Sequence, residues 1–175
     1  MTDVFVLGTG PSLTQSIVDS VRGRGIVVSV SNAYQLAPWA EALVSTDAAW
    51  WNHYNPVFDG KKYCPNLVDG TIRVSQFPPH ENSGVLACRV AREFYNPTRI
   101  CLLGFDFGGG HFFGDHPQPL QNTKPERFSV FQEQFRIELH RCEQAGIQLI
   151  NCTENSQLKK IPKLPLSEFL DSKHA

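Results

Sequence analysis

Residues 104–117 gather the side chains of this sequence that suit acid–base or metal chemistry. The segment contains five glycines, two histidines and two aspartates. His111 and His116, with Asp115 beside them, could form a general base with an orienting carboxylate, or could ligate a metal ion. Solvated loop histidines are the alternative that these residues leave open. The glycine run 108–110 indicates a mobile or tightly packed backbone, which would let the histidines close over a ligand.

A second segment suits the binding of an anion. Residues 4–7 are apolar and run directly into Gly8-Thr9-Gly10-Pro11-Ser12, after which a helical pattern begins. This order predicts a buried strand, a tight turn and a helix N-terminus, where unpaired N–H groups favour a phosphate. Leu13 stands where the dinucleotide fingerprint has its third glycine, and no Gly-Lys-Ser/Thr follows, so neither complete motif is present. A turn without a ligand is the alternative. We expect a phosphorylated ligand, most simply a nucleotide, to be cradled by Gly8, Thr9, Gly10 and Ser12.

Further polar residues follow predicted strands or begin predicted helices. The amide of Asn32 suits the edge of a base or a ribose, or else caps a short helix. Asp47 could hold a metal ion, a ribose or a proton, or cap the tryptophan-rich helix that follows it. Ser83 and Gly84 begin another helix and offer either a second anion site or a simple cap. Asp106 follows a later strand in the same way, and all of these residues are candidates for binding a ligand.

Apolar runs that alternate with helical patterns predict the elements that position these residues. Strands are expected at 4–7, 26–30, 42–45, 99–103 and 147–150, with short ones near 62–64 and 72–74. Helices are expected at 12–22, 48–54, 82–95 and 125–145, with short ones after residue 31 and near 167–170. This alternation predicts an α/β fold with a mostly parallel sheet and helices on both faces. Ligands of such sheets bind beyond the carboxyl ends of the strands, where the polar segments converge.

Length and composition favour one domain and limit the partners. The chain has 175 residues, 41% of them hydrophobic, with 16 Lys and Arg against 17 Asp and Glu. This length suits a single domain over 1–175 with one core. The net charge of −1 gives no basic excess for binding nucleic acid, and no apolar run is long enough to span a membrane. We therefore expect neither a nucleic-acid nor a membrane partner.

The cysteines and the start of the chain favour a cytoplasmic protein. The five cysteines form no Cys-x-x-Cys pair, which favours reduced, buried thiols and argues against a structural zinc site. The chain enters its first expected strand without the pattern of a signal peptide. No metal ligands are assigned on this basis.

Five blocks of sequence, in this order, resemble a known group of proteins. They are residues 6–13 (Val-Leu-Gly-Thr-Gly-Pro-Ser-Leu), Ser31-Asn32, 82–85 (Asn-Ser-Gly-Val), 102–106 (Leu-Leu-Gly-Phe-Asp) and 149–152 (Leu-Ile-Asn-Cys). Together with a histidine after the fourth block, they resemble the DUF115 and family-42 sialyltransferase group, whose members are Rossmann-like. Residues 46–51 (Thr-Asp-Ala-Ala-Trp-Trp) and 112–117 resemble most closely the small phage-encoded members called norphogenetic proteins.

The resemblance implies a Rossmann-like fold and a nucleotide ligand. In the sialyltransferases the corresponding glycine turn, asparagine and Ser-Gly helix start surround a CMP-sugar, and a histidine of the late loop is the base for the acceptor hydroxyl. The resemblance therefore implies His116 as the base, with His111 as the second candidate. A related archaeal branch transfers diphosphate from ATP to a pterin. By the same resemblance the nucleotide would be held by Gly8, Thr9, Gly10, Ser12, Asn32, Ser83 and Gly84.

Together these observations predict a nucleotide-dependent, glycosyltransferase-like transferase that uses a nucleotide-sugar. One alternative is an ATP-using, diphosphokinase-like enzyme, for which Mg²⁺ and the carboxylates of Asp47 and Asp106 would matter. Another is a non-catalytic nucleotide-binding or phage assembly protein. The oligomeric state is left open.

Overall fold

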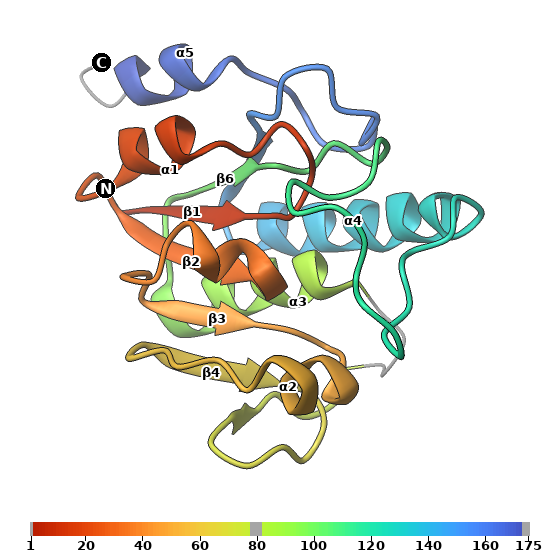
Figure 1. Ribbon diagram of the computed structural model, residues 1–175. Helices are drawn as coiled ribbons and strands as arrows, with labels where there is room; N and C mark the ends of the chain where they lie inside the picture. The colour runs from red at the N-terminus through yellow and green to blue at the C-terminus, as the bar shows by residue number, and fades with distance from the viewer. Residues whose placement is uncertain (1, 78–81, 173–175) are drawn as a thin grey trace.

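The computed structural model describes residues 2–77 and 82–172, which fold around one parallel sheet (Figure 1). All pairs of neighbouring strands in the sheet run parallel. The strand order is β5-β4-β3-β2-β1-β6-β7. The strands are β1 (Asp3–Leu7), β2 (Ile26–Val30), β3 (Ala42–Val44), β4 (Lys61–Cys64), β5 (Ile72–Arg73), β6 (Arg99–Leu103) and β7 (Gln148–Asn151).

The order of the strands places a change of direction beside β1. The chain first adds strands on one side of β1, from β2 out to β5, and then returns to add β6 and β7 on the other side. Loops that leave β1 and β6 therefore diverge, and such a point opens a crevice at the carboxyl ends of the strands. The long connection after β6 runs past these strand ends from the level of β6 towards α2 and back to α4 (Figure 1).

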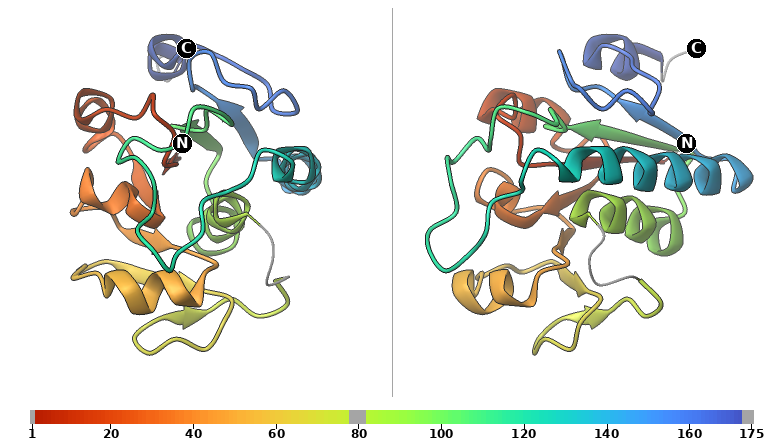
Figure 2. Two further views of the ribbon diagram at one scale, coloured as in Figure 1. Left: turned by 45° about the vertical axis from the view of Figure 1, so that its right-hand side comes forward. Right: turned by 90° about the vertical axis from the view of Figure 1, so that its right-hand side faces the viewer.

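Helices cover both faces of the sheet (Figure 2). One face carries α1 (Gln15–Val21), the 3₁₀-helix η1 (Ser31–Gln35), α2 (Ala48–Tyr54) and α5 (Leu166–Asp171). The other carries α3 (Ser83–Val90), its π-helical continuation η2 (Ala91–Tyr95) and α4 (Arg127–Gln144). The alternation of β1 explains this arrangement, because Val4 and Val6 face one layer while Phe5 and Leu7 face the other. The predicted single Rossmann-like α/β domain with helices on both faces is confirmed.

Two buried carboxylates help to hold the layers together. Asp3 accepts hydrogen bonds at 2.9 and 2.8 Å from Arg99 on β6, and the same guanidinium donates to Ser172 just after α5. Glu138 on α4 is fully buried and pairs at 2.9 Å with Arg92 in η2. Buried charges require such partners, since each would otherwise lose its hydration without compensation.

Several element boundaries differ from the sequence expectation. The first helix begins at Gln15 rather than residue 12, because Thr14 is the N-cap and its hydroxyl accepts from Ile17 N at 3.3 Å. The longest helix begins at Arg127 rather than 125. The expected cap at Ser31-Asn32 is wrong, since η1 has no side-chain cap.

The cysteines are buried, as the sequence predicts. All five cysteines are buried free thiols. Among the described helices, none is long and apolar enough to cross a membrane.

Candidate functional site

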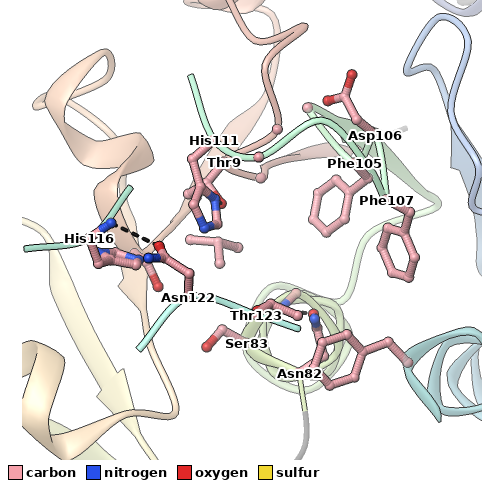
Figure 3. A pocket seen from close by; sticks show the side chains of 18 of the residues that line it. Thr9, Asn82, Ser83, Phe105, Asp106, Phe107, His111, His116, Asn122 and Thr123 are labelled. Atoms are coloured by element: carbon pink, nitrogen blue, oxygen red, sulfur yellow. Dashed lines mark hydrogen bonds between the residues drawn. The ribbon is translucent and has the colours of Figure 1, made fainter. Parts of the chain in front are cut away.

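A cleft of about 400 Å³ lies at the carboxyl ends of the strands, where the connections after β1 and β6 diverge. Figure 3 shows its interior, with the imidazoles on one side, phenylalanine rings on the other and the start of α3 between them. Side chains of α2 and α4 complete the wall. The lining comes from residues 8–10, 30–31, 45–47, 82–84, 104–111, 115–116 and 121–123, with Trp50, Pro125, Phe128 and Phe131.

Most of the residues predicted from the sequence meet in this cleft. The structure thus brings together segments that are far apart in the chain, as the parallel α/β arrangement requires. Ser12 and Asn32 are the two that do not line it. Those that line it are Gly8, Thr9, Gly10, Asp47, Ser83, Gly84, Asp106, His111, Asp115 and His116.

The glycine turn after β1 holds a carboxylate of the protein itself. Asp106 Oδ2 accepts hydrogen bonds from Ser12 Oγ at 2.8 Å and from Ser12 N at 3.4 Å. A Cβ on Gly10 would lie 1.9 Å from the same carboxylate oxygen. The backbone of the turn is also bonded to the end of β6, through Gly10 N to Gly104 O at 2.8 Å. The donors of Ser12 that we expected to meet a phosphate are therefore engaged by Asp106.

Asn32 is part of the core under the cleft. Its side chain is 1% exposed, and its Oδ1 accepts a hydrogen bond from Trp50 Nε1 at 2.7 Å. Trp50 in turn lines the cleft. Asn32 therefore acts on the cleft through the tryptophan it orients, instead of capping η1.

The helices that begin beside the cleft are capped by side chains, as their sequences suggest, but Asn82 takes the capping role at α3 in place of Ser83. Asp47 caps α2, because its Oδ1 accepts from Ala49 N at 2.8 Å. Asn82, and not Ser83, caps α3, through Oδ1 and Gly84 N at 2.7 Å. The hydroxyl of Ser83 instead accepts from Thr46 N at 3.0 Å and so joins α3 to the loop after β3.

Both loop histidines are held through Nδ1 by hydroxyl groups. The Nδ1 of His111 lies 2.9 Å from Thr9 Oγ1, and that of His116 lies 3.1 Å from the phenolic oxygen of Tyr54. The two imidazole centroids are 5.2 Å apart. Phe113 stacks on the ring of His111 with an interplanar angle of 5°. Each imidazole therefore has Nε2 left for chemistry, since Nδ1 is occupied.

The surroundings favour the neutral form of both imidazoles. Burial lowers the pKa of His111, and contacts with Thr9 and the charge of Asp115 oppose this only in part. Burial also lowers the pKa of His116, and the nearby His111 lowers it further against the opposing charges of Asp47 and Asp115. A neutral imidazole is the form that can accept a proton.

Asp115 does not orient either histidine directly. Its side chain is exposed at the rim, and within the described ranges no hydrogen bond joins it to an imidazole. The hydroxyls of Thr9 and Tyr54 have the orienting role that the sequence suggested for this carboxylate. Its charge acts only through space, on the pKa values of both rings.

The charges of the cleft are unusual for a site that binds an anion. Three carboxylates line it, from Asp47, Asp106 and Asp115, but no lysine or arginine of the described chain does. No group of three or more His, Cys, Asp or Glu side chains in the described ranges could hold a metal ion. Donors in the cleft are therefore neutral: hydroxyls, amides and backbone N–H groups.

Sequence reasoning missed Tyr54, which holds His116, and the phenylalanines that line the cleft. Tyr54 gave no signal, because its contact with His116 joins positions 62 residues apart. The helical spacing of Phe128, Phe131 and Phe135 is typical of residues that face a core, and Phe107 lies in a loop without such a pattern. Phe135 is indeed fully buried and Phe131 nearly so, but Phe128 and Phe107 are only partly covered.

No family model matches this chain, and a comparison with curated proteins finds no match.

Proposed function

We propose that the cleft binds a nucleotide-linked donor and that the protein transfers a group from it to an acceptor hydroxyl, as glycosyltransferases do. The observation that carries this proposal is the pair of imidazoles held through Nδ1 in a cleft at the change of strand direction. In open parallel sheets this is the place where nucleotides bind. The resemblance of the sequence to the sialyltransferase group agrees with this choice.

In this proposal His116 is the general base. Its Nε2 would take the proton of the acceptor hydroxyl while the bond between the transferred group and the phosphate oxygen breaks. Tyr54 fixes the ring through Nδ1, and the backbone N–H of His116 donates to Asn122 Oδ1 at 2.8 Å, which holds the main chain. His111 lies beside it as a second polar contact.

The donors for the leaving phosphate would be the hydroxyls of Thr9 and Ser83, which belong to the lining, and the positive end of the α3 dipole would add to them. Because no lysine or arginine of the described chain lines the cleft, these donors suit one phosphate better than a triphosphate. This favours a nucleoside-monophosphate sugar as donor.

The carboxylates of the lining support the ATP-using alternative. Mg²⁺ is commonly held by one or two carboxylates together with substrate phosphates. Asp47 and Asp115 line the cleft and could provide such carboxylates. Strict dependence on Mg²⁺ and loss of activity in Asp47→Asn would favour a diphosphokinase-like enzyme. Transfer without added metal would exclude it.

The test is turnover of nucleotide-sugars by purified protein. A thermal-shift screen selects donors that stabilise the folded state, and release of the nucleoside phosphate is then followed by chromatography. We expect His116→Ala to lower turnover by about 10²- to 10⁴-fold with little change in donor affinity. His140→Ala, an exposed histidine on α4, is the matched control.

Full activity in His116→Ala would contradict the role of His116 as general base. Tight binding without turnover of any donor would leave the non-catalytic alternative, a nucleotide-binding or assembly protein.

A further inference from the structure

The side of the cleft opposite the imidazoles is built from phenylalanines. Phe105, Phe107, Phe128 and Phe131 all belong to the lining, and Figure 3 shows Phe105 and Phe107 across the cavity from His111 and His116. Phe105 and Phe131 are 5% and 8% exposed and form the base of this wall. The rings of Phe107 and Phe128 are more exposed than these two. We call the four phenylalanines together the aromatic wall.

The position of Phe107 is maintained against a backbone cost. Its φ is 57°, in the left-handed region that a bulky side chain rarely adopts. Its ring lies 5.6 Å from that of Phe128, tilted by 38°, and 5.6 Å from that of Phe135, edge to face. Packing on these two rings therefore offsets the backbone strain and holds Phe107 at the cleft.

Polar groups at the edge of the aromatic wall can still form hydrogen bonds with a ligand. Asn82 uses its Oδ1 to cap α3 and its backbone N–H to donate to Gln134 Oε1 at 3.0 Å. In the described part of the chain nothing accepts a hydrogen bond from its Nδ2. Thr123 also lines the cleft, and together these side chains provide both donors and acceptors.

We propose that the aromatic wall binds the base of a nucleoside, with the ring against Phe107 and Phe128 and its polar edge at Asn82 and Thr123. This inference rests on the proposed function, because it names where the nucleoside part of the donor lies. A flat heterocycle matches both features, since its faces stack on aromatic rings while its edge exchanges hydrogen bonds with amides. An alkyl chain would leave the Asn82 amide unpaired.

The arrangement also gives the ligand a direction. With the base at the aromatic wall and the reacting group at His116, the phosphate falls between them, near Ser83 and Thr9. Figure 3 shows Ser83 in that intermediate position.

The test is calorimetric titration with three kinds of probe: the four ribonucleoside 5′-monophosphates, the free nucleosides, and ribose 5-phosphate. We expect at least one nucleotide to bind, and ribose 5-phosphate to bind at least tenfold more weakly. Phe128→Ala should weaken the nucleotide by roughly tenfold or more, as loss of one stacking partner does. Phe94→Ala, which removes an exposed ring outside the cleft, should leave the affinity unchanged.

A second variant examines the polar edge without disturbing the fold. Asn82→Asp keeps the oxygen that caps α3 but replaces the Nδ2 donor with an acceptor. We expect it to fold normally and to change which of the four bases binds best. Circular dichroism melting confirms that each variant is folded.

The outcomes separate this inference from the proposed function. Ring-dependent nucleotide binding without turnover of any sugar donor would support the aromatic wall and contradict transfer. Turnover of a sugar donor with its KM unchanged in Phe128→Ala and Asn82→Asp would contradict the aromatic wall alone. Binding of ribose 5-phosphate as tightly as the nucleotides, or binding of no nucleotide at all, would overturn the inference.

Discussion

Asp106 and Ser12 join the two loops that border the cleft. Both donors of Ser12, its backbone N–H and its hydroxyl, point to one carboxylate oxygen, at 3.4 and 2.8 Å. The residues are 94 positions apart, and the bond spans the point where the chain changes direction between β1 and β6. Asp106 stands between Phe105 and Phe107, so the same bond fixes the strand end from which the aromatic wall begins.

A double-mutant cycle should detect this link. Charge-assisted hydrogen bonds contribute about 1.5–3 kcal/mol, so we expect Ser12→Ala and Asp106→Ala to share a coupling energy of about 1–2 kcal/mol in urea unfolding. Gln15 and Asp19 form an exposed bond of similar length, 2.9 Å, and should couple by about 0.5 kcal/mol or less. Equal coupling energies in the two pairs would show that the bond between Ser12 and Asp106 stabilises the fold no more than an exposed surface bond does.

Gly10 is predicted to be intolerant of any side chain. In Gly10→Ala the new Cβ would lie 1.9 Å from Asp106 Oδ2 and 2.7 Å from the backbone oxygen of Gly104. Because the backbone of Gly104 cannot move away without straining the end of β6, we expect a loss of about 1–3 kcal/mol in the free energy of unfolding. Gly108→Ala is the control, because its Cβ would meet nothing within 4 Å. Similar stability of the two variants would refute the close approach.

The sheet and the place of the cleft could be predicted because they depend on local patterns. Val4–Leu7 is apolar without interruption, as a strand buried on both faces must be. Gly8 then marks the strand end, and the parallel arrangement brings all such ends to one edge. Ten of the twelve candidate residues accordingly line one cleft.

The contacts inside the cleft could not be predicted in the same way. Asn32 follows a strand just as a helix cap does, but a tryptophan 18 residues later takes its oxygen. Phe128 has the spacing of a core residue, but its ring is only partly buried and lines the cleft. Each of these outcomes depends on tertiary neighbours that neither periodicity nor local propensity encodes.

Tyr54 is predicted to position His116. Tyr54→Phe keeps the ring against Trp50, at 5.3 Å, but removes the oxygen bonded to Nδ1. We expect turnover to fall by about tenfold, less than in His116→Ala, with donor KM unchanged and an altered pH profile. Tyr34→Phe also borders Trp50, at 6.1 Å, and should have no effect. Identical effects of the two changes would indicate a loss of packing only.

The histidines should make stability fall in mild acid. Burial lowers the pKa of both His111 and His116 from the ordinary 6.5, so the unfolded chain takes up protons first as pH falls. The free energy of unfolding should therefore decrease from about pH 6.5 down to the folded pKa values and level off below them, until carboxylates titrate.

Urea unfolding between pH 7 and pH 5 measures this slope. The double variant His111→Gln, His116→Gln should flatten it, whereas His140→Gln should not. An unchanged slope in the double variant would show that the two imidazoles are not buried in solution.

The central claim is that the cleft between the β1 and β6 connections binds a nucleotide. The most direct measurement is a crystal structure grown with the nucleoside 5′-monophosphate that binds best in calorimetry. We predict that its base lies against Phe107 and Phe128 and that its phosphate lies near Ser83. The phosphate oxygen to which the transferred group would be bonded should face His116. Density for the nucleotide elsewhere, such as the groove of Leu139, Ile147 and Pro162 beside β7, would contradict the account.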